Sequence, residues 1–259
     1  MNNLKDMMWV ETRKVLRSRM PIFTTLGAFI MPLGIGFLIF LARNPGLSKN
    51  LGLMSAKANL TAYFATTWPT YLGFSGQIVA AGGFFLFTFA ISWVFGREFA
   101  DGTLKDMLAV PISRFTILLA KFIVVAVWSA ALTIVILILS LITGAMIGLP
   151  QGSFSVILQG SALDLITACM VIAIVFPFAL FASEGRGYLL PMGVAILALI
   201  MANLVVVIGY GEYFPWSVPG LFAQGKTSLT PVSYFIVLIT GIAGIAGTYL
   251  WWKFADQSR

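Results

Sequence analysis

The sequence predicts an all-α membrane protein with six transmembrane helices. Of its 259 residues, 59% are hydrophobic and only 10% are charged, and the mean hydropathy is +0.97. Soluble domains carry about 25% charged residues, so this composition is typical of a chain that has the bilayer as its solvent. A membrane-spanning helix needs about 20 mainly apolar residues. Six stretches reach that length, at 21–41, 72–95, 119–147, 155–182, 188–209 and 232–252.

Residues 1–20, ahead of the first span, are predicted to form an amphipathic helix in the membrane interface. At 100° per residue, Asp6, Arg13 and Arg17 cluster on one side of this helix. The opposite side is apolar and is formed by Leu4, Met8, Trp9, Val15, Leu16 and Met20. Such a helix has membrane lipid as a partner. A second interpretation, a basic segment that only fixes the topology, stays open.

Lysines and arginines are distributed unevenly between the two sides of the predicted bundle. If the N-terminus is cytoplasmic, all but four of the sixteen fall on the cytoplasmic side. The four on the outer side are Arg43, Lys49, Lys57 and Lys226. The positive-inside rule therefore predicts that both termini are cytoplasmic. The same distribution accounts for the net charge of +7, so no nucleic acid partner is expected.

Prolines and glycines inside the spans predict local features of the bundle. Pro32 and Pro177 lie in the middle of spans and are expected to kink their helices. Small residues in AAGG at 80–83, and at Gly241, Gly244 and Gly247, are expected to allow close helix packing. That expectation follows because small residues let helix backbones approach one another.

The longest cytoplasmic connection, GREFADGTLKDMLAVPISR at 96–114, predicts a short amphipathic helix. Thr103 and Asp106 are spaced as in a capping box, and Pro111 ends the helical pattern. The apolar side of this helix consists of Leu104, Met107 and Leu108. Two interpretations fit these residues equally well. The helix either rests on the membrane surface or docks a cytoplasmic partner.

Residues GLFAQGKT match the phosphate-binding pattern G-x-x-x-x-G-K-[ST], but we interpret the match as a coincidence. The four matching positions are Gly220, Gly225, Lys226 and Thr227. In the predicted topology this segment lies outside the cell, where ATP is scarce. Two prolines precede it where a strand is required, and Pro231 follows where the phosphate-binding helix should continue. No cofactor is therefore expected in this chain, and any ATP chemistry must come from another chain.

The spans hold almost no charged side chains, and Asp164 is the main exception. If residues 163–183 cross the bilayer, Asp164 lies at the hydrated outer end of the fourth span, where the helix dipole favours a carboxylate. The alternative is a contact with substrate or with an ion. The single cysteine, Cys169, lies in the same apolar run and is interpreted as an inert buried thiol.

An intramembrane enzyme or a channel is the alternative class of function. The chain contains no histidine and only one candidate intramembrane aspartate. It therefore lacks the residues for a His-metal site, a Ser-His site or a paired-aspartate site, and no metal site is expected. The spans also show no ring of regularly placed polar residues, which disfavours a channel.

The whole layout resembles permease subunits of the type-2 ABC transporter family, in particular the small six-span subunits of bacitracin, lantibiotic and multidrug exporters. ETRKVLRSRMP precedes span one, EFADGTLKDMLAVPISR follows span two, and an aromatic, proline-rich segment precedes span six. The most specific part is E-x-x-x-G-T-L-x-x-x-L-x-x-P-x-S-R, which is similar to the first intracellular loop of that family.

The resemblance implies that residues 98–110 form a coupling helix that enters a cleft of a separate ABC ATPase subunit. The apolar side of this helix would be buried in the ATPase, and its carboxylates would meet basic side chains there. The implied coupling residues are Glu98, Asp101, Gly102, Thr103, Leu104, Asp106, Met107 and Leu108. Glu184 and Arg186, in the turn SEGRG, are a candidate second contact. Residues 1–20 would be an elbow helix that touches the same ATPase.

The resemblance further implies that residues 1–259 form one transmembrane permease domain, with an outer re-entrant segment at 210–231. Two such domains would line the pathway, as a homodimer or as a heterodimer with a related permease. ATP and magnesium would bind to the partner ATPase. The implied function is ATP-driven export of a hydrophobic or amphipathic substrate, such as a peptide antibiotic, a drug or a lipid-like molecule, across a bacterial cell (inner) membrane.

Overall fold

The computed structural model describes residues 3–44, 67–104, 107, 109–225 and 229–254, and the regular structure in these ranges is helical. The helices are α1 (Asn3–Leu16), α2 (Met20–Arg43), α4 (Trp68–Ile78), α5 (Phe84–Ala100), α7 (Arg114–Ile147), α8 (Phe154–Val175), α9 (Phe178–Glu184), α10 (Leu189–Val207), α11 (Val218–Gln224) and α12 (Pro231–Phe254). A π-helical turn, Val79–Gly83, joins α4 to α5.

Six segments of the described chain are long and apolar enough to cross a membrane, which confirms the predicted fold class. They are Met20–Leu41, Trp68–Ala100, Arg114–Ile147, Phe154–Glu184, Leu189–Val207 and Pro231–Phe254. Each overlaps one of the predicted spans. The protein is therefore a multi-pass membrane protein.

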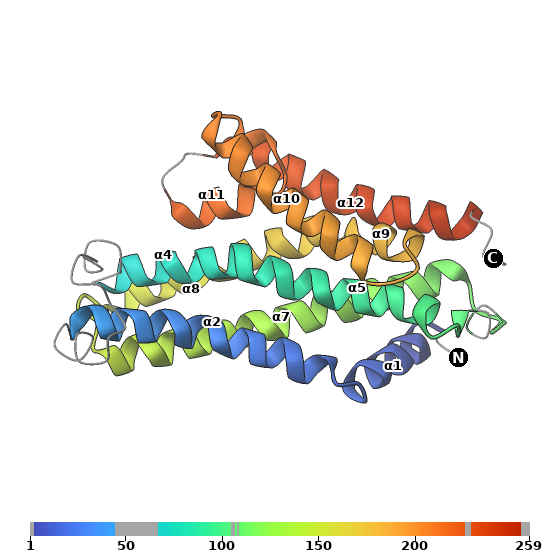
Figure 1. Cartoon of the computed structure of the whole chain (residues 1–259), viewed down its shortest axis with the longest axis horizontal. Coiled ribbons are helices and arrows are strands. Elements are labelled where there is room, and N and C mark those ends of the chain that lie inside the picture. The colour runs from blue at the N-terminus through green and yellow to red at the C-terminus, as the bar shows by residue number, and fades with distance from the viewer. Residues whose placement is uncertain (1–2, 45–66, 105–106, 108, 226–228, 255–259) are drawn as a thin grey trace.

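The longest described helix is α7. Its 34 residues extend about 50 Å at 1.5 Å per residue, which exceeds the roughly 30 Å hydrocarbon layer. It contacts α1, α2, α5, α8 and α12. Figure 1 shows α1 and α2 on one side of the bundle, α10, α11 and α12 on the other, and α4, α5 and α8 between them. The start of α1 and the end of α12 lie at the same end of the bundle.

Helix α1 packs on α7 through one stripe of side chains, Met7, Glu11 and Val15, which are buried. Their spacing of four residues places them on one face. Trp9 and Leu16 point away and are 60% and 69% exposed. The predicted helix is therefore present. Its position in the membrane interface stays a prediction, and the acidic Glu11 on its packed face was not anticipated.

Pro177 breaks the fourth span, as the sequence predicts. Helix α8 ends at Val175, and α9 begins at Phe178. A proline has no N–H to donate, and its ring displaces the carbonyl of the preceding turn. Pro32 lies inside α2, which continues through it as one helix, and a kink there stays a prediction.

Glycines permit close packing at several places in the bundle, and two of them fall in the predicted small-residue clusters. A Cβ added at Gly244 would overlap the backbone of Phe176 and Pro177, at the break between α8 and α9. A Cβ at Gly82, in the π-helical turn, would overlap the side chain of Met31 on α2. Both belong to the small-residue clusters that the sequence marked as packing sites. Gly247 is different, because a Cβ there would make only an ordinary contact with Leu180.

The lone cysteine lies on the outside of the described bundle. Cys169 is exposed, so the prediction of a buried thiol was wrong. Residues directed toward lipid are as apolar as residues in the core. An apolar run therefore does not reveal which of its side chains are buried.

The packing of α12 predicts different effects for two glycine substitutions. Gly244→Ala should lower the Tm of the purified chain by roughly 2–10 °C, because overpacking costs about 1–3 kcal/mol and the clash is with backbone. Gly247→Ala should leave the Tm unchanged or raise it, because alanine favours the helix and its Cβ would make only an ordinary contact with Leu180. Thermal unfolding in detergent measures both variants. Equal Tm values for the two variants would contradict the packing described here.

Candidate functional site

A buried lysine organises the end of the bundle that carries α1. Lys121 lies near the start of α7, and its side chain is fully buried. Its Nζ donates to both carboxylate oxygens of Glu98 on α5, at 2.7 and 2.8 Å, and to Oε2 of Glu11 on α1, at 3.2 Å. The carbonyl oxygen of Val94 accepts at 2.9 Å. Because an ammonium has three N–H donors, these contacts saturate it.

Lys14 completes a four-residue ion cluster with Glu11, Glu98 and Lys121. Its Nζ lies 2.8 Å from Oε1 of Glu11 and 3.0 Å from Oε1 of Glu98. Burial lowers the pKa of Lys14, but attraction to Glu11 and Glu98 outweighs that effect, and the pKa is raised above its usual value. Two carboxylates thus face two ammonium groups, and the cluster is neutral.

The ion cluster holds three helices together. Removing an ion from water costs several kcal/mol, so a buried charge is tolerated only when partners in the protein compensate it. Here the partners of Lys121 come from two other helices: Glu11 on α1 lies 110 residues earlier, and Glu98 on α5 lies 23 residues earlier. Separating any one of the three helices would therefore leave a buried charge without its partner.

Glu98 is used differently from the sequence-based expectation. The resemblance placed its carboxylate on a surface that meets the ATPase, but the structure buries it among the cluster. Glu11, Lys14 and Lys121 were not among the predicted site residues. One signal was available for Lys121, because it falls inside a predicted span, where a charged residue needs a partner.

The segment after α5 does not form one helix from residue 98 to residue 110. Residues 98–100 are the last turn of α5, and Asp101–Thr103 form a turn in which Gly102 adopts a left-handed φ of 68°. Helical structure resumes at Leu104, and the N–H of Met107 donates to the carbonyl oxygen of Thr103. The candidate residues Asp106 and Leu108 lie outside the described residues.

The apolar residues of this segment face their own chain, contrary to the expectation that a partner buries them. Leu104 is only 6% exposed and belongs to the main core, and Met107 packs partly buried beside it. Apolar contacts within the chain therefore bury this side of the segment. The outward residues are Asp101, Gly102, Thr103, Ala109 and Val110.

A groove about 500 Å³ in volume lies beside the ion cluster. It opens between α1, the end of α5 and the segment that follows. The residues that line it are Asp6, Met7, Val10, Lys14, Arg97, Glu98, Asp101, Thr103, Met107, Val110 and Ile112. Asp101 accepts from Nε of Arg97 at 3.0 Å, four residues earlier, in an exposed ion pair. Such a pair is worth under about 1 kcal/mol, so Asp101 can exchange partners readily.

The end of α12 is attached to the same region. Trp252 is fully buried, and its Nε1 donates to Oγ of Ser183 at 2.9 Å. The guanidinium of Arg114, the first residue of α7, donates to the carbonyl oxygens of Trp252 and Lys253. These contacts connect α12 to α7 and α9.

The turn between α9 and α10 packs against α5. A Cβ added at Gly96 would lie 2.8 Å from the backbone of Gly187, so only glycine fits there. Glu184 and Arg186 in this turn are exposed, and Arg186 has a positive φ of 49°. The structure therefore brings the candidate second contact close to the last turns of α5.

Asp164 is fully buried in α8, where it joins three helices. Oγ of Ser75 on α4 lies 2.6 Å from its Oδ2 and 3.1 Å from Oγ of Ser140 on α7. Asp164 lies about 15 Å from the start of α8 at Phe154, given 1.5 Å per residue. The expectation of a hydrated carboxylate at the helix end was therefore wrong. Its role as a substrate or ion contact stays a prediction.

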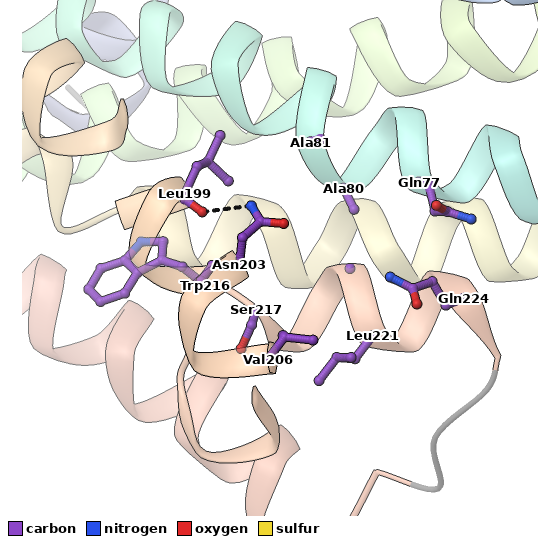
Figure 2. Close-up of a pocket in the computed structure, with 12 residues that line it drawn as sticks. Gln77, Ala80, Ala81, Leu199, Asn203, Val206, Trp216, Ser217, Leu221 and Gln224 are labelled. Atoms are coloured by element: carbon purple, nitrogen blue, oxygen red, sulfur yellow. Dashed lines mark hydrogen bonds between the residues drawn. The ribbon is translucent and has the colours of Figure 1, made fainter. Parts of the chain in front are cut away.

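A cavity of about 220 Å³ lies between α4 with its π-helical turn, α10 and α11 (Figure 2). Its lining is Gln77, Ala80, Ala81, Leu199, Ala202, Asn203, Val206, Trp216, Ser217, Gly220, Leu221 and Gln224. The Asn203 amide donates to the carbonyl oxygen of Leu199 at 2.8 Å. The indole N–H of Trp216 is buried and has no partner among the described residues. π-helical turns occur often at functional sites. The predictions from the sequence do not include this cavity.

The segment GLFAQGKT has helical structure where a phosphate loop is required. Gly220 lies inside α11, and Gly225 ends that helix with a left-handed φ of 62°. Lys226 and Thr227 lie outside the described residues. Within the segment at 210–231, α11 packs against α4 and α8. The re-entrant position of this segment in the membrane stays a prediction.

Comparison with known proteins adds two findings to this geometry. A family model described as "ABC-2 family transporter protein" matches residues 7–203. The chain is also 28% identical over 183 residues to the bacitracin transport permease protein BCRB of Bacillus licheniformis, which covers 69% of this chain and 88% of that relative. The match to the family model spans the ion cluster, the segment after α5 and most of α10.

The ion cluster predicts that a double substitution is less harmful than a single one. Lys121→Met leaves two buried carboxylates facing only Lys14, and breaking such a buried pair costs about 3–5 kcal/mol. We expect a drop in Tm of roughly 10 °C in detergent. Lys121→Met combined with Glu98→Gln restores neutrality and should recover a large part of that loss. A double variant that unfolds below the single variant would contradict the charge-balance argument.

Proposed function

Because this chain belongs to the ABC-2 family of transporter proteins, we propose that it moves a hydrophobic or amphipathic compound out of the cell. Family membership makes the chain a membrane permease subunit of an ABC transporter, with the ATPase on a separate subunit. It is thus a transporter and not an enzyme, which removes the intramembrane-enzyme alternative. The proposed substrate class is an amphipathic peptide antibiotic or a hydrophobic drug or lipid-like molecule.

The observation that carries this proposal is the similarity to a bacitracin permease over 88% of that relative. The relative's name assigns bacitracin transport to the relative itself. The cavity beside the π-helical turn supports a related substrate here, because it combines apolar walls with the amides of Gln77, Asn203 and Gln224. An amphipathic ligand needs both kinds of surface.

The proposed contact with the ATPase is the outward side of the segment after α5. Asp101, Gly102, Thr103 and Val110 are exposed there. Glu184 and Arg186 would form the second contact, and Asp106 and Leu108 belong to the same proposal although they lie outside the described residues. ATP and magnesium would bind to the ATPase, and this chain would contribute neither nucleotide nor metal ligands.

The proposed mechanism is mechanical. Closure of two ATPase subunits around ATP would move the segment after α5, and the ion cluster would transmit that movement to α7 and α1 together. Arg114 would carry α12 along through its contacts with Trp252 and Lys253. The cavity between α4, α10 and α11 would then change shape and open outward. Only contacts that differ between the two states can shift such an equilibrium.

The proposed assembly contains two permease chains, as a homodimer or a heterodimer with a related permease, in a bacterial cell (inner) membrane. Both termini would face the cytoplasm. The basic residues support this orientation, and so does the placement of α1 and the end of α12 at one end of the bundle. The segment at 210–231 would fold back into the membrane and cap the exit.

The docking proposal predicts that Val110→Asp releases the ATPase. Val110 is 45% exposed at the proposed contact, and burying a valine in the partner contributes about 1.5 kcal/mol. Co-purified ATPase should therefore fall about tenfold or more, while the Tm of the chain alone should stay within about 2 °C. Affinity purification followed by quantification of the two subunits measures the effect.

Two further variants control this experiment. Val232→Asp makes the same change at a similarly exposed position at the start of α12, and it should retain the ATPase. Leu104→Asp should lower the Tm of the chain itself, because Leu104 is buried in its own core. Full retention of the ATPase by Val110→Asp would place the docking surface elsewhere.

A further inference from the structure

A second cavity, about 310 Å³ in volume, lies between α1 and the end of α5. It is lined by Trp9, Val10, Arg13, Lys14, Arg17, Ser18 and Arg97. Four of these seven side chains are basic and none is acidic. Such a concentration of positive charge at one cavity favours an anionic ligand.

The four basic side chains differ in how their charges are balanced. Lys14 belongs to the ion cluster, and Nε of Arg97 donates to Asp101 at 3.0 Å. In the described part of the chain, no carboxylate pairs with Arg13 or Arg17. The guanidinium of Arg13 lies over the ring of Trp9, 4.7 Å from its centre. The positive charges of Arg13 and Arg17 at this cavity are therefore not neutralised by any described carboxylate.

An apolar groove begins three residues beyond the rim of this cavity. Pro21, Ile22, Thr25, Leu26 and Phe29 form it on the first turns of α2, with a volume of about 370 Å³. Ser18, which lines the cavity, and Pro21, at the start of the groove, are three residues apart, so at most about 10 Å of chain separates them. Trp9, which lines the cavity, is 60% exposed, as is typical of tryptophan at the level of lipid headgroups. A charged cavity thus adjoins an apolar surface at the start of a membrane span.

We propose that the cavity of Arg13, Arg17 and Arg97 binds the phosphate headgroup of an anionic phospholipid, with an acyl chain along the groove of Pro21–Phe29. A guanidinium group can bind a phosphate through two parallel N–H···O hydrogen bonds, so this cluster of arginines suits a phosphate ligand. Basic pockets between helices at the membrane surface take such headgroups. The adjacent groove favours a lipid over a free phosphate, because a soluble anion would leave that apolar surface without a ligand.

The bound headgroup would act on the two features that adjoin its cavity. Lys14 belongs to both the cavity and the ion cluster, and Arg97 connects the cavity to Asp101. A phosphate on Arg97 would compete with Asp101 for that guanidinium. The lipid would thereby influence the segment that is proposed to dock the ATPase. This consequence rests on the proposed function, whereas lipid binding itself does not.

Native mass spectrometry of the purified full chain tests the site without any ATPase. The chain is titrated with phosphatidylglycerol, phosphatidylcholine or inorganic phosphate. We expect phosphatidylglycerol to bind several-fold more tightly than phosphatidylcholine, and inorganic phosphate at millimolar concentration not to displace it. Each basic residue at an anionic surface contributes about 1 kcal/mol, or about fivefold in affinity. Arg13→Gln and Arg17→Gln should each weaken phosphatidylglycerol binding about fivefold, and the double variant about 25-fold.

Arg19→Gln is the matched control, because Arg19 is exposed in the same segment but does not line the cavity. It should change the affinity less than twofold. The Tm of the double variant should stay near that of the unaltered chain, since neither arginine pairs with a described carboxylate. Phosphatidylglycerol carrying brominated acyl chains should also quench tryptophan fluorescence more than brominated phosphatidylcholine does, and Trp9→Phe should reduce that difference. That difference should vanish in the double variant.

Several outcomes would overturn the proposal. Equal affinity for the two lipids, or an equal effect of Arg19→Gln, would show general attraction to the membrane without a site. Displacement of phosphatidylglycerol by millimolar inorganic phosphate would show a site for a free anion. If the double variant binds phosphatidylglycerol normally but loses its ATPase, the cavity binds an acidic surface of the partner.

Discussion

The charge of Lys121 constrains the arrangement of this end of the molecule. Its ammonium group is fully buried, and the carboxylates that balance it come from α1 and α5. Moving any of the three helices away would leave an uncompensated buried charge, which costs several kcal/mol. The ion cluster therefore holds the three helices together at this end of the molecule. Lys14 extends this constraint to the surface, because its side chain is 31% exposed and reaches both carboxylates.

The ion cluster also determines what the segment after α5 can present to a partner. Glu98 points inward at the end of α5, the chain then turns at Asp101–Thr103, and Leu104 returns to the core. The outward surface is then polar and small, with Val110 as an exposed apolar side chain. A partner that pushes on this surface moves α5 and α7 together, because the cluster joins them. The same segment adjoins the basic cavity through Arg97, so a docking surface and a lipid site would share one ion pair.

The six spans and the Pro177 break could be predicted because both depend on local composition. A span needs only length and apolarity, and a proline removes a hydrogen bond wherever it stands. The helical spacing of Leu104 and Met107 was also recognisable in the sequence, but the contacts that bury these two side chains were not. Leu104 and Met107 have the pattern of an apolar face, and that pattern fits a contact with another subunit as well as a contact with this chain. The structure shows that their own chain covers them.

The sequence by itself determined the fold class, the number of spans and the family, since hydropathy and a short loop motif are read along the chain. Tertiary structure alone decided the partners of charged and polar groups: Lys121 with Glu11, 110 residues away, and Asp164 with Ser75, 89 residues away. It also decided that Cys169 is exposed, which its apolar run did not reveal. Lipid and protein core are equally apolar, so periodicity cannot separate the two faces of a span. Charge pairing is settled only when distant helices meet, because a buried charge takes whichever opposite charge the fold brings within reach.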